Sequence, residues 1–114
     1  MRRADLLLTL AGLSGAIAVA AGAFGAHGAS GDAVNWLRTG ALYQMVHAVA
    51  VIALGGRWQG KGPAATLLAG ATIFAFSLYA MAFGGPRWLG AVTPIGGALM
   101  IAGWLWLASR GLRR

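Results

Sequence analysis

The chain has 114 residues, of which 59% are hydrophobic, and its mean hydropathy is +0.72. A water-soluble domain carries only about 45–50% apolar residues even with glycine counted. This composition therefore excludes a water-soluble domain and indicates a membrane protein. Nine Lys and Arg residues against two acidic ones give a net charge of +7, and the absence of cysteine excludes disulfides and thiol catalysis.

Long stretches without a charged residue predict four transmembrane helices. The stretches are residues 6–31, 39–56, 62–86 and 88–109. Each is close to or above the ~18–20 residues that a membrane-spanning helix needs. We place the helices at about residues 6–27, 34–56, 63–84 and 89–109. The predicted fold is an all-α membrane protein, one domain over residues 1–114, with four transmembrane helices in an antiparallel bundle.

The first predicted helix carries small residues on two faces. One stripe, at a spacing of four, consists of Ser14, Ala18, Gly22 and Ala26. A second stripe nearby consists of Gly12, Ala16 and Ala20. Small side chains let two helix backbones approach closely in a membrane. We interpret most of these positions as packing within one bundle, and the alternative is that one stripe faces a second protomer.

The second predicted helix contains hydrogen-bonding side chains in an otherwise apolar run. They are Tyr43, Gln44 and His47, and their spacings of three and four place them on one helical face. Ser77 and Tyr79 of the third predicted helix lie at a similar depth or slightly further out. Unpaired polar groups are costly in hydrocarbon, so we expect these five residues to form one cluster inside the bundle.

The predicted cluster has two interpretations. In the first it is structural, and interhelical hydrogen bonds join the second helix to the third. In the second, protons or a small solute pass His47, because ionisable groups inside membranes commonly mark transport paths. Few polar groups lead from the cluster to either membrane face, which favours the structural interpretation.

Two further polar residues are candidate sites at the outer ends of the helices. His27 ends the first predicted helix and is expected to cap it or bind water. Thr93 precedes Pro94 and fits the N-cap of the fourth helix, where an anion can bind. His27 and His47 differ in depth by about 20 Å, which argues against their ligating one haem iron.

The sequence offers no recognisable catalytic constellation. Only Asp5 and Asp32 are acidic, and both lie near helix ends, so paired carboxylates are missing. Ser14 and Ser77 lack an evident His–Asp arrangement, and the glycine-rich segments do not match a phosphate-binding loop. We therefore predict no enzymatic activity, no cofactor and no metal site.

The basic residues are distributed unevenly along the chain. Four spans place the N-terminus, the second connection and the C-terminus on one side, which the positive-inside rule predicts to be cytoplasmic. This distribution argues against a nucleic-acid partner and favours the lipid bilayer, and lipid binding at the basic rim is a third interpretation. The predicted cytoplasmic side holds Arg2, Arg3, Arg57, Lys61, Arg110, Arg113 and Arg114, and the opposite side holds Arg38 and Arg87.

Four segments, taken in order, resemble the DUF 423 family of small bacterial inner-membrane proteins, which has a related eukaryotic transmembrane family. They are "GAFGAHG" (22–28), "TGALYQMVHAVA" (39–50), "FAFSLYAM" (74–81) and "TPIGGALMIAGW" (93–104). The resemblance implies a four-helix protein of the bacterial inner membrane with unassigned biochemical function, and it supplies no catalytic residue. Where the family often has an "FSGSLY"-like segment, Ala75 and Phe76 fill the space beside Ser77.

These observations lead to one functional prediction. The chain is expected to be a structural, accessory or assembly component of the membrane, as a homo-oligomer or within a larger membrane complex. Transport through the polar residues around His47 is the alternative. A continuous polar route to both membrane faces would distinguish transport from the structural role.

Overall fold

The computed structural model describes residues 3–57 and 59–112. Its long helices are α1 (Arg3–His27), α2 (Asp32–Gly55), α3 (Lys61–Ala82) and α4 (Thr93–Leu112), with a short 3-10 helix η1 (Arg87–Ala91) before α4. All four, with α4 counted together with η1, are long and apolar enough to cross a membrane. The described residues contain no strand, and the predicted all-α fold with four transmembrane helices is confirmed.

The fourth predicted helix, residues 89–109, differs from the structure at its start. Residues 87–91 form the 3-10 helix η1, and the α-helix begins only at Thr93. Pro94 explains the interruption, because a continuous α-helix would need its missing N–H to donate to the carbonyl of Gly90. At the other end of the connection, Gly84 adopts φ 98°, a left-handed conformation that suits glycine and follows the end of α3.

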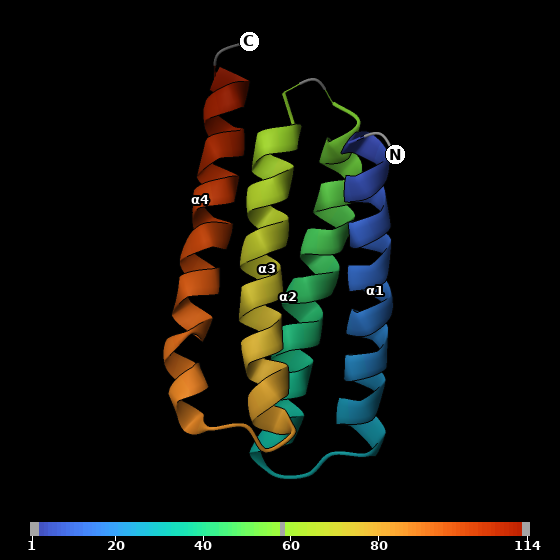
Figure 1. Cartoon of the computed structure of the whole chain (residues 1–114), viewed down its shortest axis with the longest axis vertical. Helices are drawn as coiled ribbons and strands as arrows, with labels where there is room; N and C mark the ends of the chain where they lie inside the picture. The colour runs from blue at the N-terminus through green and yellow to red at the C-terminus, as the bar shows by residue number, and fades with distance from the viewer. Residues whose placement is uncertain (1–2, 58, 113–114) are drawn as a thin grey trace.

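The helices alternate in direction along the bundle (Figure 1). α1 packs against α2, α2 against α3, and α3 against α4. Among the described residues, the backbone of α4 makes no close contact with that of α1 or α2, so the bundle is open along this side. α1 begins and α4 ends at the same end of the molecule (Figure 1).

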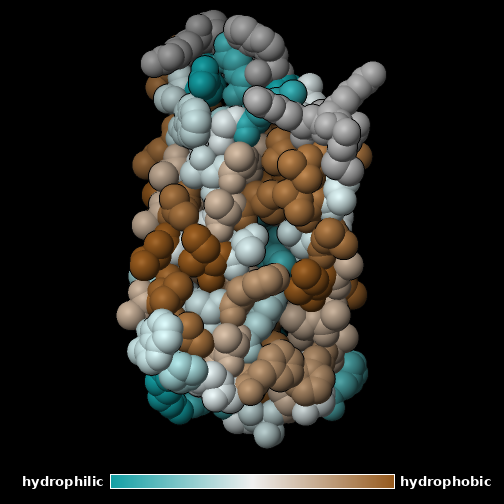
Figure 2. Space-filling view, viewed as in Figure 1, coloured by the Kyte–Doolittle hydropathy of each residue, from teal (hydrophilic) through white to brown (hydrophobic). Residues whose placement is uncertain are grey.

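The surface divides into bands that suit a membrane. Hydrophilic residues gather at the two ends, and hydrophobic residues cover much of the length between them (Figure 2). Large apolar side chains such as Leu13, Val49 and Ile101 are more than half exposed along the helices. Acyl chains solvate such side chains as well as a protein core does, so their exposure fits a molecule surrounded by lipid.

α1 packs on α2 through a seam of small residues. The buried residues of this seam on α1 are Ala11, Ser14, Ala18 and Gly25. Their spacings of three, four and seven residues correspond to a repeat of about 3.5 residues, which is typical of left-handed helix packing. The predicted stripe of Ser14, Ala18, Gly22 and Ala26 leaves the seam at Ala26, which is exposed, because a spacing of four drifts around the helix. The second predicted stripe is exposed on the outer face.

Glycines bring α3 and α4 into backbone contact. A Cβ atom added to Gly70 would lie 2.7 Å from the amide nitrogen of Met100 and 2.9 Å from the carbonyl oxygen of Gly96. Seven residues after Gly96, Gly103 faces Leu67, whose Cδ2 atom would lie 2.7 Å from an added Cβ. Close backbone packing of this kind replaces the hydrophobic drive that is missing between helices in lipid.

Gly96 and its neighbour Gly97 provide a matched pair for testing this contact. Gly96→Ala should lower the free energy of unfolding by about 1–3 kcal/mol, because the added methyl group forces the two helices apart. Gly97→Ala should not destabilise the protein, because nothing lies within 4 Å of a Cβ at Gly97. Thermal unfolding of both variants in detergent measures the difference, and equal melting temperatures would contradict the α3–α4 packing.

Candidate functional site

His47 lies in the middle of α2 with only 4% of its surface exposed. Its Nδ1 atom is 2.7 Å from the carbonyl oxygen of Tyr43, one turn earlier. Its Nε2 atom accepts a hydrogen bond of 3.0 Å from the indole Nε1–H of Trp104 on α4. An indole N–H can only donate, so Nε2 is unprotonated and Nδ1–H donates to the Tyr43 carbonyl. Both nitrogens of a neutral imidazole are therefore occupied.

Sequence reasoning did not find Trp104 as the partner of His47, although one signal was available. Both residues lie eight positions before the end of their helix, His47 before Gly55 and Trp104 before Leu112. α2 and α4 run in the same direction, so both residues lie about 12 Å from the same end of the bundle. Trp104 is 41% exposed, and an indole N–H in the apolar part of a membrane needs an acceptor, which His47 offers at that depth.

Gln44 and Tyr79 form a second buried pair. The hydroxyl of Tyr79 donates to Oε1 of Gln44 at 2.7 Å, and the two side chains are only 9% and 2% exposed. The Tyr79 ring lies directly over Gly40, where an added Cβ would come within 2.6 Å of the ring. Because Gly40 has no side chain, the Tyr79 ring fits against α2 and its hydroxyl reaches Gln44.

Ser77 and Thr93 form a third pair, away from His47. Their hydroxyl oxygens are 2.6 Å apart, and Ser77 also lies 2.8 Å from the carbonyl oxygen of Phe74. The Thr93 hydroxyl points back to the carbonyl oxygen of Leu89 at 3.3 Å, a contact with η1 and not with the amides of its own first turn. The candidate N-cap therefore serves as a link between α3 and the start of α4.

The remaining candidate residues stand outside these pairs. Tyr43 is 43% exposed, and its ring packs against Phe74 with 4.8 Å between the centroids. His27 is exposed in the last turn of α1, where a basic group interacts favourably with the helix dipole. The five residues expected to form one cluster thus separate into distinct contacts.

Each of the three polar pairs joins a different pair of helices. His47 and Trp104 join α2 to α4, Gln44 and Tyr79 join α2 to α3, and the third pair joins α3 to α4. Together they connect three of the four helices, and α1 is held by its seam of small residues instead. The geometry is that of a set of interhelical hydrogen bonds.

The described residues contain no group of three or more His, Cys, Asp or Glu side chains that could hold a metal ion. Asp32 lies 3.6 Å from Arg87 at an exposed end of the bundle, and the side chain of Asp5 lies outside the described part of the chain. The Asp32–Arg87 pair is solvent-exposed, so its contribution to stability is small. His47 has no carboxylate partner among the described side chains.

Proteins of similar sequence identify the chain's family. A family model described as "Protein of unknown function (DUF423)" matches residues 21–97. The chain belongs to the DUF423 family. It is 43% identical over 110 residues to a UPF0382 membrane protein of Haemophilus influenzae, a match that covers 89% of each protein. It is 34% identical over 108 residues to the UPF0382 inner membrane protein YgdD of Escherichia coli, covering 86% of this chain and 82% of that protein.

Membership of the DUF423 family confirms the resemblance found in the sequence. The names of these relatives state a membrane location and no biochemical activity, so the chain is a small multi-pass membrane protein of unassigned biochemical function. The family segment includes Gln44, His47 and Tyr79, whereas Trp104 lies beyond it. No solved structure matches the chain.

The Gln44–Tyr79 pair can be tested with a double-mutant cycle. Tyr79→Phe should lower the free energy of unfolding by about 1–3 kcal/mol, because it leaves the buried oxygen of Gln44 without its donor. Adding Gln44→Leu to Tyr79→Phe should recover much of that loss, because both polar partners are then removed. Thermal unfolding in detergent measures the wild type, Tyr79→Phe, Gln44→Leu and the double variant, and strictly additive effects would show that the two side chains do not interact.

Proposed function

We propose that the chain is a non-catalytic structural component of the bacterial inner membrane, an accessory or assembly protein. The observation that carries this proposal is the hydrogen bonding of His47, the one histidine inside the bundle. Its two ring nitrogens are hydrogen-bonded to the Tyr43 carbonyl and to the Trp104 indole, so the imidazole links α2 to α4. A proton carrier needs a nitrogen that faces a donor or acceptor along a continuous path.

The separation of the polar pairs also supports a structural role. Gln44 and Tyr79 are bonded to each other, and Ser77 is bonded to Thr93 near one end. Each pair satisfies its own groups, and the hydrogen bonds run between helices, across the direction that a transported proton would take. In lipid, such bonds fix which helices pair and at what depth.

The outer helices leave surface for a partner or for lipid. Only 11% of the apolar span of α1 is buried inside the bundle, against 50% for α3. The exposed face of α1 includes Gly12, Ala16 and Ala20, the second predicted stripe. A flat face of small residues suits close approach by another transmembrane helix, from a second copy or from a larger complex.

A flux measurement tests the structural role against transport. Purified protein in liposomes with an internal pH-sensitive dye should show no proton flux, in the wild type or in His47→Gln. His47→Gln should also keep the fold, because an amide can still accept from Trp104 and donate to the Tyr43 carbonyl. Flux in the wild type that disappears in His47→Gln would overturn the structural role, because an amide does not titrate near neutrality.

We further propose that both termini face the cytoplasm. Arg57, Lys61 and Arg110 lie at the end of the bundle where α1 begins and α4 ends, and Arg38 and Arg87 lie toward the other end. The terminal residues Arg2, Arg113 and Arg114, which lie outside the described residues, add to this excess in the sequence. Basic residues are retained on the cytoplasmic side during insertion, which supports this orientation.

Reporter fusions test the orientation directly. A reporter active only in the cytoplasm should be active when fused to either terminus, and a reporter active only in the periplasm should be silent at both. A fusion in the α1–α2 connection, after Gly28, serves as the control and should give the opposite pattern. Periplasmic activity at either terminus would contradict the proposed orientation.

A further inference from the structure

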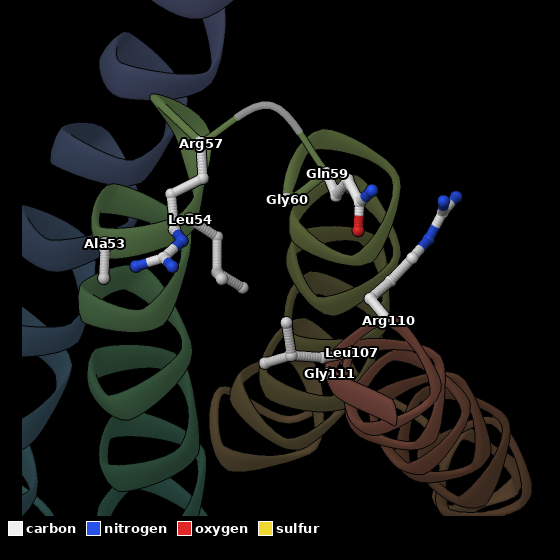
Figure 3. Close-up of a pocket in the computed structure, with 8 residues that line it drawn as sticks. All are labelled: Ala53, Leu54, Arg57, Gln59, Gly60, Leu107, Arg110 and Gly111. Carbon is white, nitrogen blue, oxygen red and sulfur yellow. The ribbon is translucent and has the colours of Figure 1, made fainter. Parts of the chain in front are cut away.

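A pocket of about 370 Å³ opens at the end of the bundle where the basic residues gather. It lies between the last turns of α2 and α4 and the connection between α2 and α3 (Figure 3). Its size falls within the range of about 300–1,000 Å³ that is usual for small-ligand sites. Its lining includes Ala53, Leu54, Arg57, Gly60, Leu107 and Arg110.

The walls of the pocket are apolar where it enters the membrane-spanning part of the bundle. Leu54 of α2 and Leu107 of α4 point toward each other across it (Figure 3). Ala53 adds a small side chain to the α2 side. α2 and α4 make no close backbone contact, so the pocket stands at the open side of the bundle, which acyl chains can reach.

The rim of the pocket is polar and positively charged. Arg57 lines the pocket, and its guanidinium group extends along α2 toward Ala53 (Figure 3). The stem of Arg110 lines the other side, and its guanidinium group lies 5.7 Å from the centre of the Trp106 ring. Neither arginine forms an ion pair with a described acidic side chain. The planar guanidinium group matches the geometry of a phosphate and binds it through two parallel hydrogen bonds.

The backbone of the connection keeps the pocket in shape. The amide of Arg57 donates to the carbonyl of Leu54 at 3.0 Å, and the amide of Gly60 donates to the carbonyl of Arg57 at 3.1 Å. Any side chain at Gly60 would collide with the carbonyl oxygen of Leu54. The turn therefore holds the backbone of Arg57 beside the apolar walls.

We propose that this pocket binds one anionic phospholipid, with its phosphate at Arg57, an acyl chain along Ala53, Leu54 and Leu107, and Arg110 adding positive charge at the rim. The positive charge of the rim favours an anionic headgroup. The apolar wall next to the rim favours a ligand that also carries a hydrocarbon chain. Basic pockets between transmembrane helices commonly hold anionic headgroups at this level of the membrane. The site is independent of the interhelical hydrogen bonds around His47.

Native mass spectrometry of the purified protein in detergent tests this site. Phosphatidylglycerol, titrated from low concentration, should occupy one tight site, and zwitterionic phosphatidylethanolamine should bind far more weakly. Arg57→Gln should weaken phosphatidylglycerol binding by about tenfold, because a charge-assisted hydrogen bond is lost. Ala53→Phe should weaken it without a change of charge, because the ring fills the place of the acyl chain.

Arg38→Gln provides the matched control. Arg38 borders a hollow at the opposite end, formed with Asn35, Thr39 and Leu42 from α2 alone, and it is exposed. The same loss of charge there should leave phosphatidylglycerol binding unchanged. Equal weakening by Arg38→Gln and Arg57→Gln would overturn the proposal, because net charge alone would then explain the binding.

A soluble phosphate compound tests whether the ligand is a lipid headgroup or a free phosphate compound. Glycerol 3-phosphate, at concentrations that saturate the site with phosphatidylglycerol, should neither bind measurably nor displace the lipid. Binding of glycerol 3-phosphate with similar affinity would replace the lipid by a soluble phosphate as the ligand. Melting temperatures in lipid-free detergent verify that each variant is folded, and unchanged lipid binding in folded Arg57→Gln would also overturn the proposal.

Discussion

In a hydrocarbon environment, a polar side chain must find its partner within the protein, and this requirement determines how the helices are arranged. Water is absent from the bilayer core, so an unsatisfied hydroxyl, amide or imidazole there is costly. His47, Gln44 and Tyr79 meet the requirement by bonding across helix boundaries. Apolar contacts cannot supply this selectivity, because lipid tails are as apolar as leucine side chains.

Glycine positions make these hydrogen bonds geometrically accessible. Gly40 leaves the space that the Tyr79 ring occupies on its way to Gln44. Gly70 and Gly96 bring α3 and α4 so close that Ser77 and Thr93 meet at 2.6 Å near the start of α4. The two kinds of feature depend on each other: small residues permit the approach, and polar pairs set the register in which it occurs.

The helices could be predicted from the sequence, and the pairing of their side chains could not. Charge-free stretches and hydropathy depend on each segment alone, so they located four spans within a few residues. The break before α4 depends on the hydrogen bond that Pro94 cannot make, a local feature that hydropathy does not register. Helical spacing placed Tyr43, Gln44 and His47 on one side of α2, yet the structure exposes Tyr43 and buries the other two.

Which side chains meet across two helices depends on the rotation of each helix about its axis. A single sequence determines that rotation only weakly. Trp104 lies at the depth of its partner His47, and Ser77 bonds to Thr93 although the sequence alone pointed to a partner on α2. The seam on α1 shows the same limit, because a spacing of four and a spacing of 3.5 coincide over two turns and diverge at Ala26. Depth is thus readable from position along a helix, whereas facing direction emerges only when all four helices pack together.

The open side of the bundle connects the buried hydrogen bonds to the basic pocket. α4 is joined to α2 by the hydrogen bond from Trp104 to His47, and Leu107 of α4 faces Leu54 of α2 nearer the end of the bundle (Figure 3), without close backbone contact between the helices. Because the two backbones do not come close to each other, space remains between these helices, and Arg57 and Arg110 border that space. A lipid bound there would bridge α2 and α4 at the membrane surface, as Trp104 and His47 bridge them inside. The open side of the bundle therefore provides a place where a bound lipid would strengthen the packing of α2 against α4.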